Sequence, residues 1–292
     1  MARNTLVPAK DVKRILLLHH PKIPRSLEFA REWSAQFEQL SVHTTILDGW
    51  NDAAIVQCVA GTDLAITLGG DGTILRAARL CAPTRVPILG VKMGRIGFLS
   101  ELKPEQFDAP AVVENKFWLE ERTMLAAVLT RAGQGIGAYE ALNEAVVGRG
   151  QLARVIRLAT YIDGDYLTTF VADGAIVSTA TGSTAYAAAA GGPILAPEVK
   201  SLVLVPIAPY LSQVKSLVLP QGSRVTFQLK TDHSSILTID GQIHLELQDG
   251  DEISIAPSAH VARFARLQSR TYFYRTLVER LREREARQLE AP

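Results

Sequence analysis

The 292-residue chain is poor in cysteine and has no long uninterrupted apolar run. Its two cysteines, Cys58 and Cys81, show no metal-ligand spacing, and such sparse use of cysteine favours the reducing cytoplasm. Proline or glycine breaks each apolar stretch before it reaches membrane-spanning length; residues 202–211, for example, contain two prolines. No amino-terminal segment combines charge, an apolar run and a cleavage site. We therefore expect a soluble protein without a signal peptide, beginning with a loose tail over residues 1–11.

The chain also lacks an excess of charge of either sign. It has 31 basic and 30 acidic residues, which are mixed along the sequence and give a net charge of +1. Nothing in this pattern indicates a nucleic-acid or membrane surface, so we expect neither as a partner. The length suits two domains, each large enough to bury its own core.

Two common nucleotide-binding motifs are absent, the G-x₄-G-K-[S/T] loop and the G-x-G-x-x-G turn. A different glycine-rich turn, GGDGT, occupies residues 69–73. The apolar run before it, residues 64–68, predicts a buried strand, and residues 73–81 predict a helix with Thr73 as its capping residue. Glycines let a ligand approach the backbone, and a helix start offers free N–H groups to anions. The sequence therefore predicts a phosphate cradle that contains Asp71.

A carboxylate in a phosphate site needs an explanation, because it repels the ligand. Asp71 either holds Mg²⁺ or takes the proton from a hydroxyl group that attacks phosphorus. The alternative is that Asp71 only caps the helix, since Gly/Asp turns are common.

A second turn of related character lies in residues 173–193. An apolar strand at residues 175–177 leads through a hydroxyl-rich turn into an alanine helix that ends at Gly191. Ser183 or Thr184 is the expected N-cap, and the small side chains would leave the first-turn amides open to a ligand. Such turns also cap many helices that bind nothing.

Taken together, these segments resemble the NAD kinases, the enzymes that phosphorylate NAD to NADP. The resemblance rests on GGDGT at residues 69–73, Asn143-Glu144, and DG-x₃-ST-x-TGSTAY-x₄-GGPI at residues 173–194. The GGDG motif alone is shared with diacylglycerol, sphingosine and phosphofructo-kinases, whereas the TGSTAY block is specific. The order of motifs matches from about Lys13 to Leu281.

The first part of the chain alternates strand and helix patterns, which predicts a doubly wound α/β domain with a parallel sheet. The expected strands are residues 14–18, 41–47, 64–68 and 86–91, and the expected helices are residues 26–40, 52–60 and 73–81.

The rest of the chain alternates with period two, for example at residues 225–229 and 243–247, and predicts a mostly antiparallel β-sandwich domain. Hairpin turns are expected at residues 163–164 and 249–251. The border near Lys103 gives an α/β domain over residues 1–102 and a β domain over residues 103–265. Residues 266–292 return to helical spacing and, by the resemblance, complete the first domain. The apolar side of this helix is expected to carry Tyr274, Leu277, Val278 and Leu281.

The resemblance implies an in-line attack by the 2′-hydroxyl of the adenosine ribose of NAD on the γ-phosphorus of ATP. Asp71 is the expected base, and the amides of Gly70, Gly72 and Thr73 are expected to hold phosphate oxygens, with Mg²⁺ neutralising the triphosphate. The protein ligands of the metal stay unassigned. The cleft between the two domains is the expected site, and a homodimer or homotetramer the expected assembly.

For NAD, the resemblance assigns Asn143 and Glu144 to the adenosine half, and Tyr186 to stacking on a ring. Residue types alone leave Arg76 open as a solvated helix residue, Phe98 as a core aromatic and Gln242 as a turn residue. The full expected set is Gly72, Arg76, Phe98, Asn143, Glu144, Arg154, Asp173, Thr184, Ala185, Tyr186, Ala189 and Gln242. His19 and His20, which end the first strand, are expected to be structural.

Some positions depart from the usual pattern of the family. They are Lys92 for an asparagine, Val171 for an arginine, Ala180 for a proline, Ala189 for a serine, Tyr210 for a histidine and Lys215 for an arginine. They leave open the phosphoryl donor and the choice between NAD and NADH. Two other functions also remain open. A lipid or sugar kinase with GGDG would not require Asn143-Glu144 or TGSTAY, and a dinucleotide sensor without turnover would not require Asp71.

Overall fold

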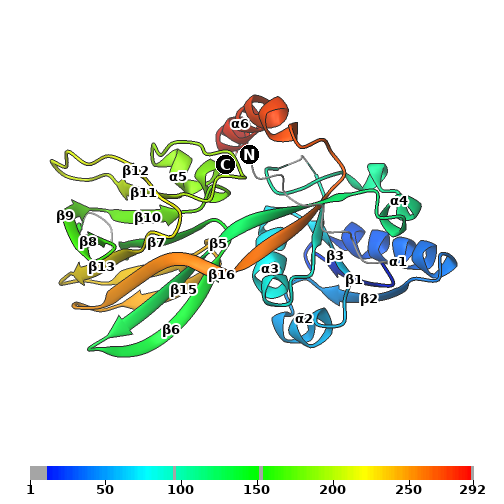
Figure 1. Cartoon of the computed structure of the whole chain (residues 1–292), viewed down its shortest axis with the longest axis horizontal. Coiled ribbons are helices and arrows are strands. Elements are labelled where there is room, and N and C mark those ends of the chain that lie inside the picture. The colour runs from blue at the N-terminus through cyan, green and yellow to red at the C-terminus, as the bar shows by residue number, and fades with distance from the viewer. Residues whose placement is uncertain (1–11, 95–96, 151–153, 291–292) are drawn as a thin grey trace. The chain divides into compact units, whose positions relative to one another are not determined.

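The computed structural model describes residues 12–94, 97–150 and 154–290, so the expected tail over residues 1–11 lies outside the described residues. The chain forms two compact units: unit 1 comprises Met1–Glu121 and Ala262–Pro292, and unit 2 comprises Arg122–Val261 (Figure 1). The division falls within two long strands, β5 (Trp118–Arg131) and β16 (Glu252–Arg266), rather than near Lys103.

Unit 1 contains a parallel sheet in the order β2-β1-β3-β4, as the alternating pattern predicts. The strands are β1 (Arg14–His19), β2 (His43–Asp48), β3 (Leu64–Gly69) and β4 (Ile88–Lys92), with helices α1 (Pro24–Gln39), α2 (Asp52–Val59) and α3 (Asp71–Cys81) between them. The chain runs from β1 outward to β2 and then back past β1 to β3. The direction of winding therefore changes between β1 and β3, and open parallel sheets bind ligands at the carboxyl ends of such strands.

The core of unit 1 lies between this sheet and α1. Leu17 of β1 and Ile66 of β3 are buried against Trp33 and Phe37 of α1. The Trp33 ring stacks on Phe107 with 3.7 Å between ring centroids. Phe107 follows a short 3₁₀ helix, η2 (Pro104–Gln106), which precedes α4 (Ala109–Val113); another 3₁₀ helix, η1 (Ala82–Thr84), follows α3.

The last helix, α6 (Tyr272–Glu290), belongs to unit 1 as expected, but its predicted apolar side is wrong. Tyr272 and Arg280 are buried, whereas Tyr274 and Val278 are mostly exposed. Leu281 is also predicted to lie on the apolar side, but its side chain is outside the described part of the chain. The Arg280 guanidinium lies over the Tyr272 ring at 5.4 Å, and burial lowers its pKa. Helical spacing located the helix, but a long arginine stem takes the place of an apolar residue on the buried side.

Unit 2 contains a six-stranded antiparallel sheet in the order β12-β11-β10-β7-β14-β15. Its strands are β12 (Leu217–Leu219), β11 (Leu202–Ile207), β10 (Gly174–Ser178), β7 (Glu144–Arg149), β14 (Ser235–Ile239) and β15 (Ile243–Leu247). A second antiparallel layer is formed by β13 (Val225–Lys230), β8 (Ile156–Ile162) and β9 (Asp165–Ala172) with β16, and β6 (Gln134–Ala141) pairs with β5. The antiparallel prediction is therefore confirmed.

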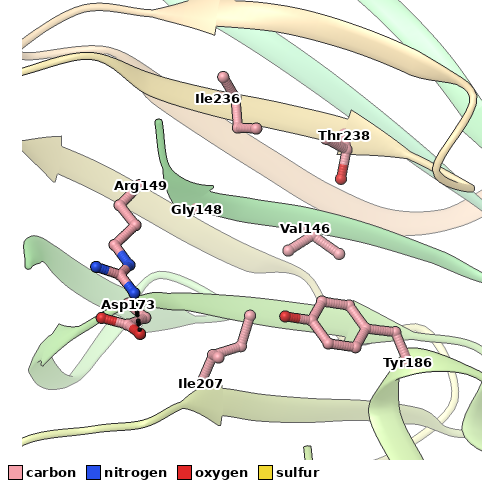
Figure 2. A pocket seen from close by; sticks show the side chains of 8 residues that line it. All are labelled: Val146, Gly148, Arg149, Asp173, Tyr186, Ile207, Ile236 and Thr238. Atoms are coloured by element: carbon pink, nitrogen blue, oxygen red, sulfur yellow. Dashed lines mark ion pairs between the residues drawn. The ribbon is translucent and has the colours of Figure 1, made fainter. Parts of the chain in front are cut away.

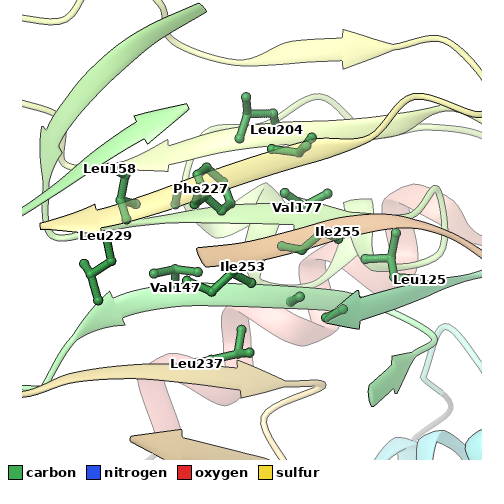
Figure 3. Packing of buried hydrophobic residues seen from close by; sticks show 14 of the residues in the cluster. Leu125, Val147, Leu158, Val177, Leu204, Phe227, Leu229, Leu237, Ile253 and Ile255 are labelled. Carbon is green, nitrogen blue, oxygen red and sulfur yellow. The ribbon is translucent and has the colours of Figure 1, made fainter. Parts of the chain in front are cut away.

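The core of unit 2 is filled by alternate side chains from both layers. Phe227 and Ile253 point inward from one layer, and Val147, Val177 and Leu204 point inward from the other (Figure 3). Period-two sequences form such strands because every second side chain faces the core.

One predicted hairpin is confirmed and the other is wrong. Asp163 and Gly164 join β8 to β9 with φ values of 53° and 95°, as in an Asp-Gly turn with both residues left-handed. Residues 249–251 instead link β15, which pairs with β14, to β16, which pairs with β13. The turn signal was correct, but the partner of each strand lies in a different layer.

Asp251, in the turn between layers, is fully buried on its carboxyl group and binds Arg131 through Nε and a terminal nitrogen, each at 2.8 Å. Burial favours the neutral acid, but the Arg131 guanidinium and the amide of Gln248 outweigh it. The pKa of Asp251 is therefore below its ordinary value.

No helix within the described residues is long and apolar enough to cross a membrane.

A buried charge cluster holds the carboxyl end of β16 inside unit 1. Arg266 is fully buried and donates to Glu120 at 2.7 Å, to Glu101 at 3.1 Å and to the Leu99 carbonyl oxygen at 3.0 Å. Burial by itself lowers the pKa of Arg266, yet the two carboxylates raise it above its ordinary value. The charge of Arg266 is therefore compensated by two buried carboxylates.

We expect Arg266→Met to destabilise the protein by about 3–5 kcal/mol, because it leaves two buried carboxylates without their cation. Urea unfolding measures the change. The matched control is Arg85→Met, whose ion pair with Glu121 is exposed and contributes about 1 kcal/mol or less. Equal effects of the two substitutions would show that the buried cluster contributes no more than a surface pair.

Candidate functional site

The GGDGT turn forms the start of α3, and Asp71 is its first residue. Gly70 is the N-cap, so neither Thr73, the predicted cap, nor Asp71 caps the helix with its side chain. The Thr73 N–H donates to the Gly70 carbonyl oxygen at 3.1 Å, which leaves this amide less available to a phosphate than expected. The helix begins two residues earlier than predicted because glycine allows the chain to turn at once after β3.

The Asp71 carboxylate has two close neighbours, Lys92 and Gly97. Lys92 Nζ, at the end of β4, lies 2.9 Å from Asp71 Oδ1, and their side chains are 9% and 35% exposed. On the other side, a β-carbon added to Gly97 would collide with the Asp71 carboxyl group. Lys92 is in register with Gly69 on the neighbouring strand, which brings it beside the turn. The departure at Lys92 therefore supplies the direct partner of the expected base.

Arg76 and Phe98 are both engaged within unit 1. Arg76 forms an ion pair with Asp52 of α2 and lies 5.8 Å from the centre of the Trp50 ring, so it is not simply solvated. Phe98 is half-buried, and the guanidinium of Arg280 lies over its ring at 5.8 Å.

In unit 2, one carboxylate fixes the segment that contains Asn143 and Glu144. Asp240, in the turn between β14 and β15, accepts the N–H groups of Leu142, Asn143 and Glu144 at 2.8, 2.8 and 3.1 Å. The Glu144 side chain is buried and that of Asn143 is half-buried. Hydrogen bonds to one carboxylate therefore fix the backbone at the start of β7.

Two further segments lie next to residues 142–144: the start of the TGSTAY block and the turn between β14 and β15. The Asn143 carbonyl oxygen accepts the Thr179 N–H at 2.9 Å, and a β-carbon on Gly182 would collide with that carbonyl group. Gln242 donates its N–H to Ile239 at 2.9 Å and so closes the turn after β14, as its turn interpretation requires.

The TGSTAY block does not form the predicted capped helix. A 3₁₀ helix, η3 (Gly182–Thr184), is followed by a single turn, α5 (Tyr186–Ala189), whose cap position is Ala185. Ser183 donates instead to the Ala180 carbonyl oxygen and accepts the Leu195 N–H, and Thr184 donates to Thr181. The prediction of Ser183 or Thr184 as N-cap is therefore wrong. The hydroxyl groups fold the loop upon itself, and with so short a helix the expected first-turn anion site is lost.

A cavity of about 350 Å³ lies beside this loop and is lined by residues of β7, β11, β14 and α5 (Figure 2). At one end Arg149 and Asp173 form an ion pair at 3.0 Å, and the Tyr186 ring extends from α5 toward that pair. Tyr186 is 44% exposed. Sequence analysis found Asp173 and Tyr186 but missed Arg149, because no local signal separates it from other arginines. An aromatic ring and a charged pair in one cavity suit a ligand with a flat ring and polar groups.

Arg154 lines a different cavity of unit 2, of about 570 Å³, together with Arg157, Lys230 and His233. Val171 lies opposite Arg157 in the β8–β9 pair, and its neighbours Phe170 and Ala172 are buried. Val171 therefore faces away from the β core. An arginine here would stand beside Arg157 and would meet a like charge.

The remaining expected residues occupy simpler surroundings. Gly72 and Ala189 are exposed, and Ala185 is half-buried. Of the other departures, Ala180 is buried, Lys215 is exposed, and Tyr210 is 69% exposed. Within the described ranges, no group of three or more His, Cys, Asp or Glu side chains is arranged to hold a metal ion.

Comparisons with known proteins identify similar sequences for both units of the chain. Residues 4–114 match the family model of the ATP-NAD kinase N-terminal domain, and residues 142–267 match that of the ATP-NAD kinase C-terminal domain. The chain is 42% identical over 275 residues to an NAD kinase of Chloroflexus aggregans, covering 93% of this chain and 99% of that protein. It is 39% identical over 275 residues to an NAD kinase of Dehalococcoides mccartyi, covering 92% and 96%.

Two solved structures are also similar. Yeast NADH kinase complexed with NADH aligns with a TM-score of 0.83 and 26% identity, covering 92% of this chain and 87% of that one. An NAD kinase from Archaeoglobus fulgidus in complex with ATP aligns with a TM-score of 0.75 and 28% identity, covering 92% and 98%.

We expect Asp240→Ala to destabilise the protein by about 1–3 kcal/mol or more, because backbone amides around residues 142–144 lose their acceptor. Thermal unfolding measures the loss, and hydrogen exchange should accelerate at these amides. The control is Asp232→Ala, whose side chain is 91% exposed. Unchanged exchange at residues 142–144 would contradict the role assigned to Asp240.

Proposed function

The chain belongs to the ATP-NAD kinase family, and on that premise we propose that it transfers the γ-phosphoryl group of Mg–ATP to the 2′-hydroxyl of the adenosine ribose of NAD, giving NADP. Kinase chemistry follows from the family. The observation that supports the assignment of the base is the Asp71 carboxylate at the start of α3, held by Lys92 and still 35% exposed.

Asp71 is the proposed general base. As the ribose oxygen bonds to the γ-phosphorus, its proton passes to the carboxylate, and the bond to the bridging oxygen of ADP breaks. Lys92 contacts Oδ1, so Oδ2 is the oxygen that we assign to the proton. The ammonium group orients the carboxylate.

The donor phosphates are proposed to lie at the start of α3. The amides of Gly70 and Gly72 and the positive end of this helix attract anions, and Thr73 stands at the same turn with its N–H already bonded to Gly70. Mg²⁺ would be bound as the complex with ATP, where phosphate oxygens would be its main ligands.

For the acceptor, Asn143 and Glu144 are proposed to bind the adenosine half of NAD. Asp240 fixes their backbone N–H groups, which supports this proposal because a preorganised backbone loses less entropy when the ligand binds. Asp173 and Tyr186 are proposed to contact the dinucleotide in the 350 Å³ cavity. The further proposed contacts are Gly72, Arg76, Phe98, Arg154, Thr184, Ala185, Ala189 and Gln242.

The cellular setting is part of the same proposal. The sparse use of cysteine is consistent with a cytoplasmic enzyme of NADP biosynthesis. One of the two cysteines, Cys81, is buried, and burial raises the pKa of its thiol to about 12. A homodimer or homotetramer is the proposed assembly.

The decisive experiment incubates the purified protein with NAD, Mg²⁺ and ATP and assays for NADP. Parallel reactions replace NAD by NADH, and ATP by polyphosphate, to define the acceptor and the donor. We expect NADP with NAD and ATP; no phosphorylation of either dinucleotide with any donor would refute the proposed function.

We expect Asp71→Asn to lower kcat by about 10²–10⁴-fold, because the amide keeps the shape of the carboxylate but does not accept the proton. NAD binding and the melting temperature should change little. Steady-state kinetics with a thermal melt tests both points. A variant that keeps more than half of the wild-type kcat would exclude Asp71 as the base.

We expect Asn143→Ala to raise KM for NAD much more than KM for ATP, because Asn143 is assigned to the acceptor. The control Gln134→Ala removes an exposed amide side chain from β6 and should change neither constant. One steady-state series that varies each substrate in turn measures both. Equal increases for NAD and ATP would refute the assignment.

A further inference from the structure

An exposed tryptophan stands at the carboxyl edge of the parallel sheet of unit 1. Trp50 follows β2 and is 42% exposed, whereas Trp33 is 2% exposed in the core. His20, just after β1, meets the Trp50 ring edge-on with 5.2 Å between centroids. Lys22 Nζ lies 5.2 Å from the ring centre, and the Arg76 guanidinium lies 5.8 Å from it.

The two cations beside Trp50 differ in how firmly they are held. Arg76 is fixed by its ion pair with Asp52. Lys22 is exposed and has no carboxylate partner in the part of the chain that the structure describes. Trp118 differs from Trp50 because its indole N–H is bonded to the Gln268 carbonyl oxygen, at 2.7 Å. Of the two cations beside the Trp50 ring, only Arg76 is held by an ion pair within the described residues.

The loop that carries Trp50 packs against the start of α3. A β-carbon added to Gly49, the residue before Trp50, would lie 3.1 Å from the His19 carbonyl oxygen and 3.2 Å from Thr73 Cγ2. Arg76 stands on the same helix as Asp71. The strands β1 and β3, where the winding direction changes, end at His19 and Gly69. The tryptophan, the cations and the GGDGT turn thus share one edge of one sheet.

We propose that Trp50 stacks on the purine base of the phosphoryl donor, a nucleoside triphosphate whose phosphates lie at Gly70 and Gly72. The inference rests on the proposed kinase function. The base replaces the Lys22 ammonium group on the indole, and that group then pairs with a phosphate oxygen of the same nucleotide. Stacking on a tryptophan needs no hydrogen-bond pattern from the base.

The donor nucleotide is favoured over NAD because Trp50 and the amides proposed to bind the donor phosphates, those of Gly70 and Gly72, lie along the same edge of the unit 1 sheet. The adenosine of NAD is already assigned to Asn143 and Glu144. His19 and His20 are expected from the sequence to be structural. In the structure, the His19 carbonyl group packs under the loop that carries Trp50, and the His20 ring borders the indole.

The test measures dissociation constants by calorimetry, without NAD, for Mg–ATP and for Mg–tripolyphosphate, which has phosphates but no base. We expect Trp50→Ala to weaken ATP binding by about 5- to 150-fold, the range for stacking of one base, and to leave tripolyphosphate binding unchanged. Trp50→Phe should have a smaller effect on ATP. Lys22→Ala should weaken both ligands, since its partner is a phosphate.

The matched control is Tyr166→Ala, which removes another aromatic ring, 59% exposed, from β9 in unit 2. It should leave both dissociation constants unchanged. Melting curves of all variants confirm that each is folded. Wild-type affinity for ATP in Trp50→Ala would overturn the inference. So would an equal loss for ATP and tripolyphosphate, or a loss confined to NAD in a separate titration.

The assay for NADP separates this inference from the proposed function. If the wild-type protein forms NADP while Trp50→Ala binds ATP normally, the donor-base site is wrong and the kinase function stands. If ATP binding depends on Trp50 and no NADP forms, the site stands and the proposed function fails.

Discussion

The ion pair between Lys92 and Asp71 is the interaction on which the proposed chemistry of unit 1 depends. It joins the last residue of β4 to the first residue of α3, and the nearly buried ammonium group keeps a carboxylate beside a turn suited to phosphate. An unpaired carboxylate there would oppose anion binding, and an unpaired lysine would carry a buried charge without compensation. The departure from the usual asparagine therefore leaves the proposed base with a charged neighbour.

Unit 2 uses carboxylates for a different purpose. Asp240 accepts three consecutive backbone N–H groups at residues 142–144, and buried Asp251 anchors the link between the two sheet layers through Arg131. Asp240 satisfies backbone donors that would otherwise lie buried without an acceptor, whereas Arg131 compensates the buried charge of Asp251. The hydroxyl groups of the TGSTAY block act similarly, by folding the loop against the carbonyl groups of its neighbours. The proposed dinucleotide contacts thus stand on a backbone fixed by polar side chains.

The edge of the parallel sheet gathers residues that lie far apart in the sequence. His19, Trp50, Gly70 and Lys92 each follow or end a strand, and the carboxyl ends of parallel strands meet at one edge. A donor nucleotide held there would have its phosphates beside the base residue Asp71. Asn143 and Glu144, assigned to the adenosine half of the acceptor, belong to unit 2.

The sequence by itself determined the alternation of strands and helices in unit 1, the antiparallel strands of unit 2, the Asp163-Gly164 hairpin and the family of the chain. These features are local, because periodicity, turn residues and motif spacing are written in neighbouring positions. Only the tertiary structure decided that Lys92 pairs with Asp71, that Arg149 pairs with Asp173, and that residues 249–251 connect two layers. It also replaced the predicted alanine helix by a single turn and changed the buried side of α6. Each of these depends on contacts between distant segments, and a local pattern does not specify which distant partner a side chain meets.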